Sequence, residues 1–121
     1  MSLTPPTTAE RGTTGEDRAI ELLRARGYAI VERNFRCRAG ELDVVARDGD
    51  VLCFVEVRSR GTAEHGHAAE TVNHRKQQQV SRVAMYYIGQ RNPRFERSRF
   101  DVVALTGAEA TLIQDAWRLT R

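Results

Sequence analysis

The sequence has little cysteine and no long apolar run. Its two cysteines, Cys37 and Cys53, lie far apart without a Cys-x-x-Cys spacing, which argues against a zinc knuckle or a disulfide framework. No apolar stretch approaches the roughly 20 residues that a membrane-spanning helix needs. Residues 1–8 are polar and contain proline, unlike a signal peptide. We therefore expect a cytoplasmic protein with reduced thiols and no membrane partner.

The length of 121 residues is that of one domain, and it is sufficient for a single hydrophobic core. Residues 1–12 are expected to form a flexible N-terminal tail, and residues 13–121 a single domain. No internal repeat or low-complexity segment divides the chain.

Apolar periodicity and turn residues predict two helices and five strands. The predicted order is helix 13–26, strands 28–35, 41–47 and 51–58, loop 59–71, helix 73–90, and strands 99–105 and 110–114. Apolar residues recur at helical spacing in both helices, and Gly27 supplies a stop for the first. This order predicts an α/β fold in which a mixed β-sheet is flanked by helices.

The dipeptide Asp48-Gly49 separates two β-rich runs and is typical of a tight type I′ hairpin turn. With these two residues as the loop, Glu41 lies opposite Glu56, and Asp43 becomes a diagonal neighbour of Glu56. Because side chains alternate along a strand, the three acids then share one face of the hairpin.

Acids crowded on one face repel each other, and aspartate is a poor strand residue, so folding alone gives no reason for the arrangement. A hard divalent cation would neutralise them. Carboxylate oxygens in this number suit Mg²⁺ or Mn²⁺, which keep several waters and leave positions for a substrate phosphate. The alternative is that this face is the wet side of the hairpin, with Arg58 paired to Glu56 or Glu41.

Glu16 is the fourth acid of interest. It precedes Ala19, Ile20 and Leu23 by helical spacings, so it stands on the side of the first helix that turns toward the sheet. A carboxylate there needs a partner. A capping box with Thr13 accounts for the same residue equally well, and the two interpretations are compatible.

The basic residues are concentrated rather than numerous. The net charge is only +3, yet residues 75–99 contain seven basic residues and one acidic residue. All the cations except Lys76 are arginine, which binds phosphate oxygens through two donors. A solvated basic face is the alternative explanation.

Five segments together resemble the bacterial YraN-type family, over about residues 12–106. They are Gly15-Glu16, Gly40-Glu41-Leu42-Asp43, Phe54-Val55-Glu56-Val57-Arg58-Ser59-Arg60, Arg75-Lys76-Gln77 and Arg99-Phe100-Asp101-Val102-Val103. That family is similar to archaeal Holliday junction resolvases and other PD-(D/E)XK nucleases, which have a restriction-endonuclease-like fold.

The resemblance implies a metal-dependent nuclease site. Asp43 and Glu56 would ligate Mg²⁺ or Mn²⁺, and Glu16 would support the metal from the helix. Arg58 would stand where the wider superfamily usually has lysine, which is a departure from its pattern. The nucleic-acid-binding residues implied are Arg58, Arg60, Arg75, Lys76 and Gln77. An arginine can hold a phosphate but stays protonated, so it cannot act as a base.

The histidines give a weaker signal. His65 and His67 lie in the predicted loop, and His74 opens the second helix. A zinc site is conceivable, but no second ligand pair has structural-zinc spacing; solvated histidines or a phosphate contact are the alternatives.

Three functions are compatible with these patterns. The first is an endonuclease that hydrolyses phosphodiester bonds in DNA, including branched or junction DNA. The second is a non-catalytic nucleic-acid-binding module that keeps the nuclease fold, and the third is an adaptor whose hairpin face binds protein. Acids at positions 16, 43 and 56 favour the first, because a pure binding surface would shed groups that repel phosphate. DNA or RNA as substrate, and a homodimer that cuts two strands, stay open.

Overall fold

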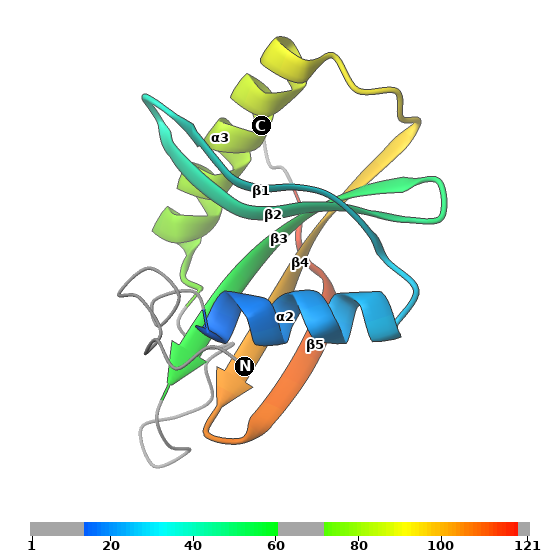
Figure 1. The fold of residues 1–121 in the computed structure, drawn as a ribbon. Helices are drawn as coiled ribbons and strands as arrows, with labels where there is room; N and C mark the ends of the chain where they lie inside the picture. Colours follow the sequence, from blue (N-terminus) through cyan, green and yellow to red (C-terminus); the bar gives the residue numbers. More distant parts are fainter. Residues whose placement is uncertain (1–13, 61–71, 119–121) are drawn as a thin grey trace, which may run out of the picture.

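A five-stranded sheet with one helix on each face forms the described part of the chain, residues 14–60 and 72–118 of a computed structural model (Figure 1). The elements are α2 (Thr14–Ala25), β1 (Ala29–Cys37), β2 (Gly40–Asp48), β3 (Val51–Arg60), α3 (His74–Arg91), β4 (Arg97–Thr106) and β5 (Glu109–Trp117). The predicted order of elements is confirmed. The predicted tail, residues 1–12, lies outside the described residues.

The strands follow one another in space as they do in the chain, β1-β2-β3-β4-β5. β3 and β4 are parallel, which requires a crossover connection, and α3 lies in that connection. The other neighbouring strands are antiparallel. The sheet is therefore mixed and flanked by helices, as predicted, and the architecture is consistent with a restriction-endonuclease-like fold.

Each face of the sheet buries its own apolar cluster. Along β3 the side chains alternate, so Leu52 and Phe54 pack with α3, whereas Cys53 and Val55 pack with α2. The apolar stripes predicted for the helices are buried in these clusters, except that Ile88 is half-buried. Neither described helix is long and apolar enough to span a bilayer.

β3 is longer than predicted, and the predicted loop 59–71 was wrong at its first two residues. Ser59 and Arg60 continue the parallel ladder, pairing with Leu105 and Thr106 of β4. Their polar side chains suggested a loop, but the hydrogen bonds to β4 are made by the backbone and do not depend on side-chain type.

The hairpin between β2 and β3 turns one residue later than predicted. Asp48 pairs with Val51, so the turn residues are Gly49 and Asp50. Gly49 has a φ of +60°, whereas Asp50 is not among the residues with positive φ. A type II′ turn needs positive φ only at its first central residue, which is the glycine here; a type I′ turn would need it at both.

The later turn changes the register of the hairpin, but residues within its paired part keep their predicted faces. Val45, rather than Asp43, lies opposite Phe54, and the two pack in the same cluster. The paired part of the hairpin ends at Val44. Leu42 packs in the α3 cluster and Val44 in the α2 cluster although they are two positions apart, so β2 twists at Asp43.

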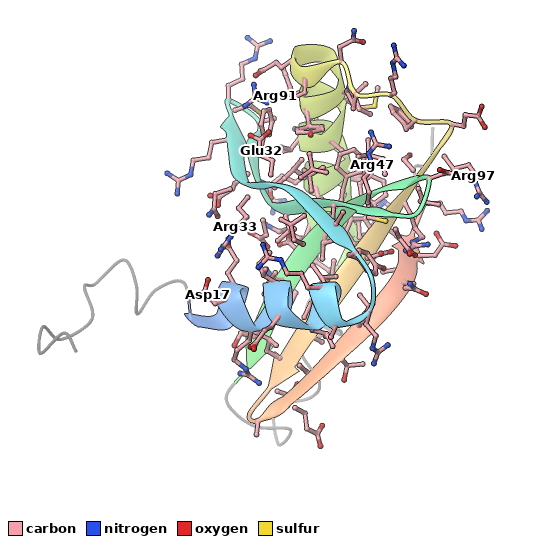
Figure 2. All side chains as sticks on the ribbon, turned by 45° about the vertical axis from the view of Figure 1, so that its right-hand side comes forward. Asp17, Glu32, Arg33, Arg47, Arg91 and Arg97 are labelled. Carbon is pink, nitrogen blue, oxygen red and sulfur yellow. The ribbon has the colours of Figure 1, made fainter. Side chains whose placement is uncertain are left out.

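Ion pairs tie the edge strand β1 to both helices (Figure 2). Arg33 donates to Asp17 of α2 at 2.8 Å, and Arg91 of α3 donates to Glu32 at 3.0 Å. Because residues 32 and 33 are neighbours on a strand, they reach opposite faces, and β1 is held from both sides.

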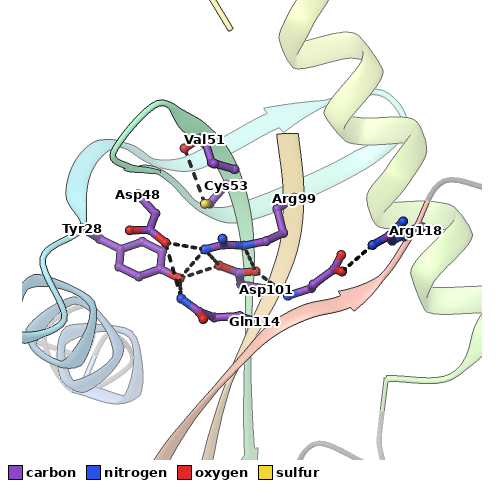
Figure 3. A network of polar contacts seen from close by, with 9 residues as sticks. Tyr28, Asp48, Val51, Cys53, Arg99, Asp101, Gln114 and Arg118 are labelled. Atoms are coloured by element: carbon purple, nitrogen blue, oxygen red, sulfur yellow. Dashed lines mark hydrogen bonds and ion pairs between the residues drawn. The ribbon is translucent and has the colours of Figure 1, made fainter. Parts of the chain in front are cut away.

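A polar network joins β4 to β5 and to the residue before β1 (Figure 3). Fully buried Asp101 accepts hydrogen bonds from the Tyr28 hydroxyl at 2.6 Å, from Arg99 Nε at 2.8 Å and from the Asp115 backbone N–H at 2.9 Å. Arg99 also donates to Asp48 at 2.8 Å. Burial and the bond to Asp101 raise the pKa of Tyr28 to about 12, so its hydroxyl stays a donor.

Candidate active site

Asp43 and Glu56 meet where β2 and β3 separate. Asp43 Oδ2 accepts the backbone N–H of Val57 at 2.8 Å, which fixes its carboxyl group beside β3. Glu56 is 3% exposed, and its carboxyl group is close enough to that of Asp43 to share a hydrogen bond. The structure therefore brings together the two acids that were predicted as metal ligands.

The first turn of α3 supplies cations to this pair. Asn73 caps the helix by accepting a hydrogen bond from the backbone N–H of Lys76 at 2.9 Å, and this places Lys76 in the first turn. Lys76 Nζ and Arg58 Nη1 each lie 3.5 Å from Glu56 Oε1. Both side chains are about one-third exposed, so they reach the carboxylate from the solvent side.

Gly40 allows α3 to lie close to the start of β2. Its φ is +139°, and a Cβ atom there would come within 2.9 Å of Gln79 Nε2 and 3.3 Å of Val83 Cγ2. A larger residue would be strained in this conformation and would push against α3. The glycine thus helps to keep α3, with its cations, beside the acid pair.

Burial and mutual repulsion keep a proton on the acid pair. Burial first, and then the charge of Asp43, raise the pKa of Glu56 to about 7 from an ordinary value of 4.5, while Lys76 and Arg58 oppose the rise. Burial also raises the pKa of Asp43, against the hydrogen bond from Val57. Without a divalent cation, the pair therefore retains a proton to near neutral pH.

This raised pKa predicts that the pair destabilises the protein as pH rises. The folded protein holds the Glu56 proton more tightly than the unfolded chain does, so the stability it confers is present below pH 4.5 and is lost between pH 4.5 and about 7. Relative to Glu56→Gln, the wild type should lose on the order of 3 kcal/mol over this range. Urea unfolding of both proteins across that range, in chelator, measures the difference; parallel curves would contradict it.

Glu16 is not part of the pair in this structure. Its carboxylate accepts hydrogen bonds from Arg33 Nε at 3.0 Å and Asn34 Nδ2 at 3.1 Å. Its charge still contributes to the raised pKa of Asp43. The capping-box alternative needs Thr13, which lies outside the described residues. Glu16 therefore stands at the edge of the site and is bound to β1 by ordinary polar contacts.

Glu41, the third acid expected on this face, stands at the edge of the site. It does not lie opposite Glu56, because the paired part of the hairpin ends at Val44; it pairs with Arg36, its cross-strand partner on β1, at 3.2 Å, and its side chain is 37% exposed. Its charge still contributes to the raised pKa of Asp43.

The two carboxylates suit Mg²⁺, which keeps several waters, better than a metal ion that takes all its ligands from the protein. Among the described residues, no group of three or more His, Cys, Asp or Glu side chains is arranged to hold a metal ion. Mg²⁺, however, is commonly bound by one or two carboxylates together with waters and substrate phosphates. Asp43 and Glu56 supply two such carboxylates. A bound cation would take the place of the proton that the pair otherwise retains.

A basic groove of about 640 Å³ lies beside the pair. Its cationic lining residues are Arg58, Arg75, Lys76 and Arg82, and none of the described lining residues is acidic. Arg82 was not predicted as a binding residue. The signal was present in the sequence, since Arg82 follows Arg75 by seven positions, two turns of the same helix face.

The other predicted binding residues are placed differently. Gln77 donates to the backbone carbonyl of Val72 at 3.1 Å and lines a neighbouring groove instead. The side chain of Arg60 lies outside the described residues, as do His65 and His67. His74 lies 3.1 Å from Gln78 Nε2 on the exposed side of α3.

Fold and site together define an α/β domain in which the carboxyl pair of Asp43 and Glu56 is flanked by cations from β3 and α3. The chain belongs to a family described as "Uncharacterised protein family UPF0102", which matches residues 15–105. This membership confirms the YraN-type resemblance.

Named members of this family align with nearly the whole chain. The UPF0102 protein of Ralstonia pickettii is 41% identical over 121 residues, covering 97% of both chains. That of Herminiimonas arsenicoxydans is 43% identical over 113 residues, covering 92% of this chain and 90% of the relative. That of Persephonella marina is 38% identical over 109 residues, covering 90% and 94%.

Proposed function

We propose that this protein is a metal-dependent endonuclease that hydrolyses phosphodiester bonds in DNA, branched or junction DNA included. The observation that carries the proposal is a carboxyl pair, one member buried and the other half-buried, beside two cations that also line a basic groove without acidic side chains among its described residues. A surface that only bound phosphate would gain nothing from two carboxylates at its end. We propose a cytoplasmic location, where the free thiols of Cys37 and Cys53 stay reduced.

Each residue of the site has a chemical role in this proposal. Asp43 and Glu56 would hold Mg²⁺ or Mn²⁺, which would supply a water of lowered pKa and charge stabilisation on the phosphoryl oxygens. Once the carboxylates are neutralised in this way, Arg58 and Lys76 can turn from Glu56 and donate to the phosphate. Arg58 stays protonated throughout and therefore positions the phosphate rather than moving a proton.

The alternative is a non-catalytic nucleic-acid-binding module with the nuclease fold. Two observations favour it: arginine stands at position 58 in place of the superfamily's usual lysine, and two cations of the protein already lie 3.5 Å from Glu56. In that case the acid pair would serve only to position Arg58 and Lys76.

A cleavage assay separates the two functions. The protein is incubated with linear duplex, branched DNA and a matched RNA, in Mg²⁺, Mn²⁺ or chelator, and products are resolved on denaturing gels. Metal-dependent cleavage of DNA supports the nuclease. Binding to DNA without products in either metal would overturn the nuclease and leave the binding module.

Arg58→Lys tests the role of position 58 in the same assay. If the cation there serves the phosphate, lysine should preserve or raise cleavage, because it supplies a donor at the same position. The melting temperature should change little, because lysine keeps a positive charge beside Glu56. A large drop in melting temperature would show instead that Arg58 is structural.

A further inference from the structure

A second groove crosses α3 next to the first. It has a volume of about 340 Å³ and lies between α3 and the end of β5, with Ser81, Trp117 and Arg118 in its lining. Gln78 and Arg82 line both grooves, so the two meet on the surface of α3. A ligand that leaves the acid pair along the first groove can therefore continue into the second.

The far wall of this second groove is held in place by buried contacts. Trp117 donates from Nε1 to Ser81 Oγ at 3.1 Å, and its ring stacks on Phe100 with 4.9 Å between centroids. These contacts fasten the end of β5 to α3. They place Arg118 in the wall of the same groove as Arg82, although the two residues are far apart in the sequence.

The charge of the combined groove favours an extended anion. None of the described residues that line either groove is acidic. Arg82 makes no ion pair or side-chain hydrogen bond with a described residue. Arg118 pairs with Asp115 at 3.1 Å (Figure 3), but its side chain is 84% exposed, so the pair is weak and solvent-screened.

The spacing of the cations suits a ligand that carries several negative charges in a row better than it suits a single small anion. Arg75 and Arg82 are two helical turns apart, about 10 Å along α3. Lys76 and Arg58 lie beside Glu56 at the start of α3, and Arg118 lies in the wall of the second groove, which Arg82 also lines. A small anion would occupy only one of these positions.

We propose that the second groove binds the phosphodiester backbone of the substrate strand away from the cleaved bond, through Arg82 and Arg118. This inference rests on the proposed function, because it takes the acid pair as the point of cleavage. It adds that the substrate extends several nucleotides across α3, and that short oligonucleotides do not reach the second groove while longer ones do.

Salt dependence of binding tests the inference without any cleavage. Arg82→Gln and Arg118→Gln are compared with the wild type and with Arg26→Gln, an exposed arginine after α2, the helix on the opposite face of the sheet. Affinities for short and long fluorescent DNA oligonucleotides are measured by anisotropy in chelator over a range of salt. Removing an arginine that neutralises one phosphate should reduce the slope of log affinity against log salt by about 0.7 for single strands or about 0.9 for duplex.

The expected result is a reduced slope for Arg118→Gln on long oligonucleotides only, a reduced slope for Arg82→Gln on both lengths because Arg82 also lines the first groove, and no change for Arg26→Gln. A slope for Arg118→Gln equal to that of Arg26→Gln on all lengths would overturn the second groove, as would a wild type that binds no DNA. The proposed function fails separately: a wild type that shows the Arg118-dependent slope but never cleaves with Mg²⁺ or Mn²⁺ keeps the groove and loses the nuclease.

Discussion

Asp43→Asn should abolish Mg²⁺ binding and cleavage while leaving the metal-free protein as stable as the wild type or slightly more stable. A neutral amide is a far weaker ligand for a hard cation than a carboxylate. The same change removes the charge that raises the pKa of Glu56 and so relieves repulsion within the buried pair. The hydrogen bond from the backbone N–H of Val57 can remain, because the amide oxygen of asparagine can still accept it.

Thermal melts with and without Mg²⁺, run beside the cleavage assay, measure both effects. Asp50→Asn is the matched control, because Asp50 lies exposed in the hairpin turn and the change should stay within about 0.5 kcal/mol of the wild type. The control should retain the Mg²⁺-induced shift in melting temperature. If Asp43→Asn unfolds the domain and Mg²⁺ never shifts the wild-type melt, the acids are structural and the nuclease proposal fails.

Asp101→Asn should have the opposite effect on stability, a loss of about 3 kcal/mol or more. Asp101 is fully buried and accepts hydrogen bonds from Tyr28, Arg99 and the backbone of Asp115. An amide group turns one accepting atom into a donor that faces other donors, and it removes the charge opposite Arg99. Asp48 alone would then pair with Arg99.

Urea unfolding at neutral pH compares this variant with Asp43→Asn and the same Asp50→Asn control. The expected order of stability is Asp43→Asn at or above wild type, Asp50→Asn equal to it, and Asp101→Asn well below. Mg²⁺ should still stabilise Asp101→Asn where it folds, because the network lies away from the acid pair. Equal losses for Asp43→Asn and Asp101→Asn would contradict the distinction between a functional acid and a structural one.

The sequence context alone does not distinguish the roles of Asp43 and Asp101. Both stand in β-rich runs beside apolar residues, and Asp101 belongs to one of the segments that carry the family resemblance. The two aspartates differ in the groups that face their carboxylates. Donors from three segments surround Asp101, whereas Asp43 faces a second carboxyl group. Tyr28 and Asp115 lie far from Asp101 in the chain, and no local pattern reports that they meet it.

The elements and the helix faces followed from local physics and were predicted. Apolar periodicity located both helices, the glycine-containing turn located the hairpin, and alternation put Glu56 on the opposite side of β3 from Val55. The turn was predicted one residue early, at Asp48-Gly49 instead of Gly49-Asp50. In both positions Gly49 supplies positive φ, so the dipeptide did not distinguish them. The shift leaves the alternation of side chains in the paired part of the hairpin unchanged, and Asp43 and Glu56 meet as predicted.

Composition and periodicity, which act over a few residues, were enough to predict the α/β class, the acids at positions 43 and 56, and the basic character of residues 75–99. Which charges meet depends on the folded arrangement of distant segments. It turned Glu16 to Arg33 and Glu41 to Arg36, brought Lys76 to Glu56, and set Arg118 beside the groove of Arg82. The reason is that these partners depend on the twist of β2 and on where α3 crosses the sheet, which are fixed by packing between distant segments.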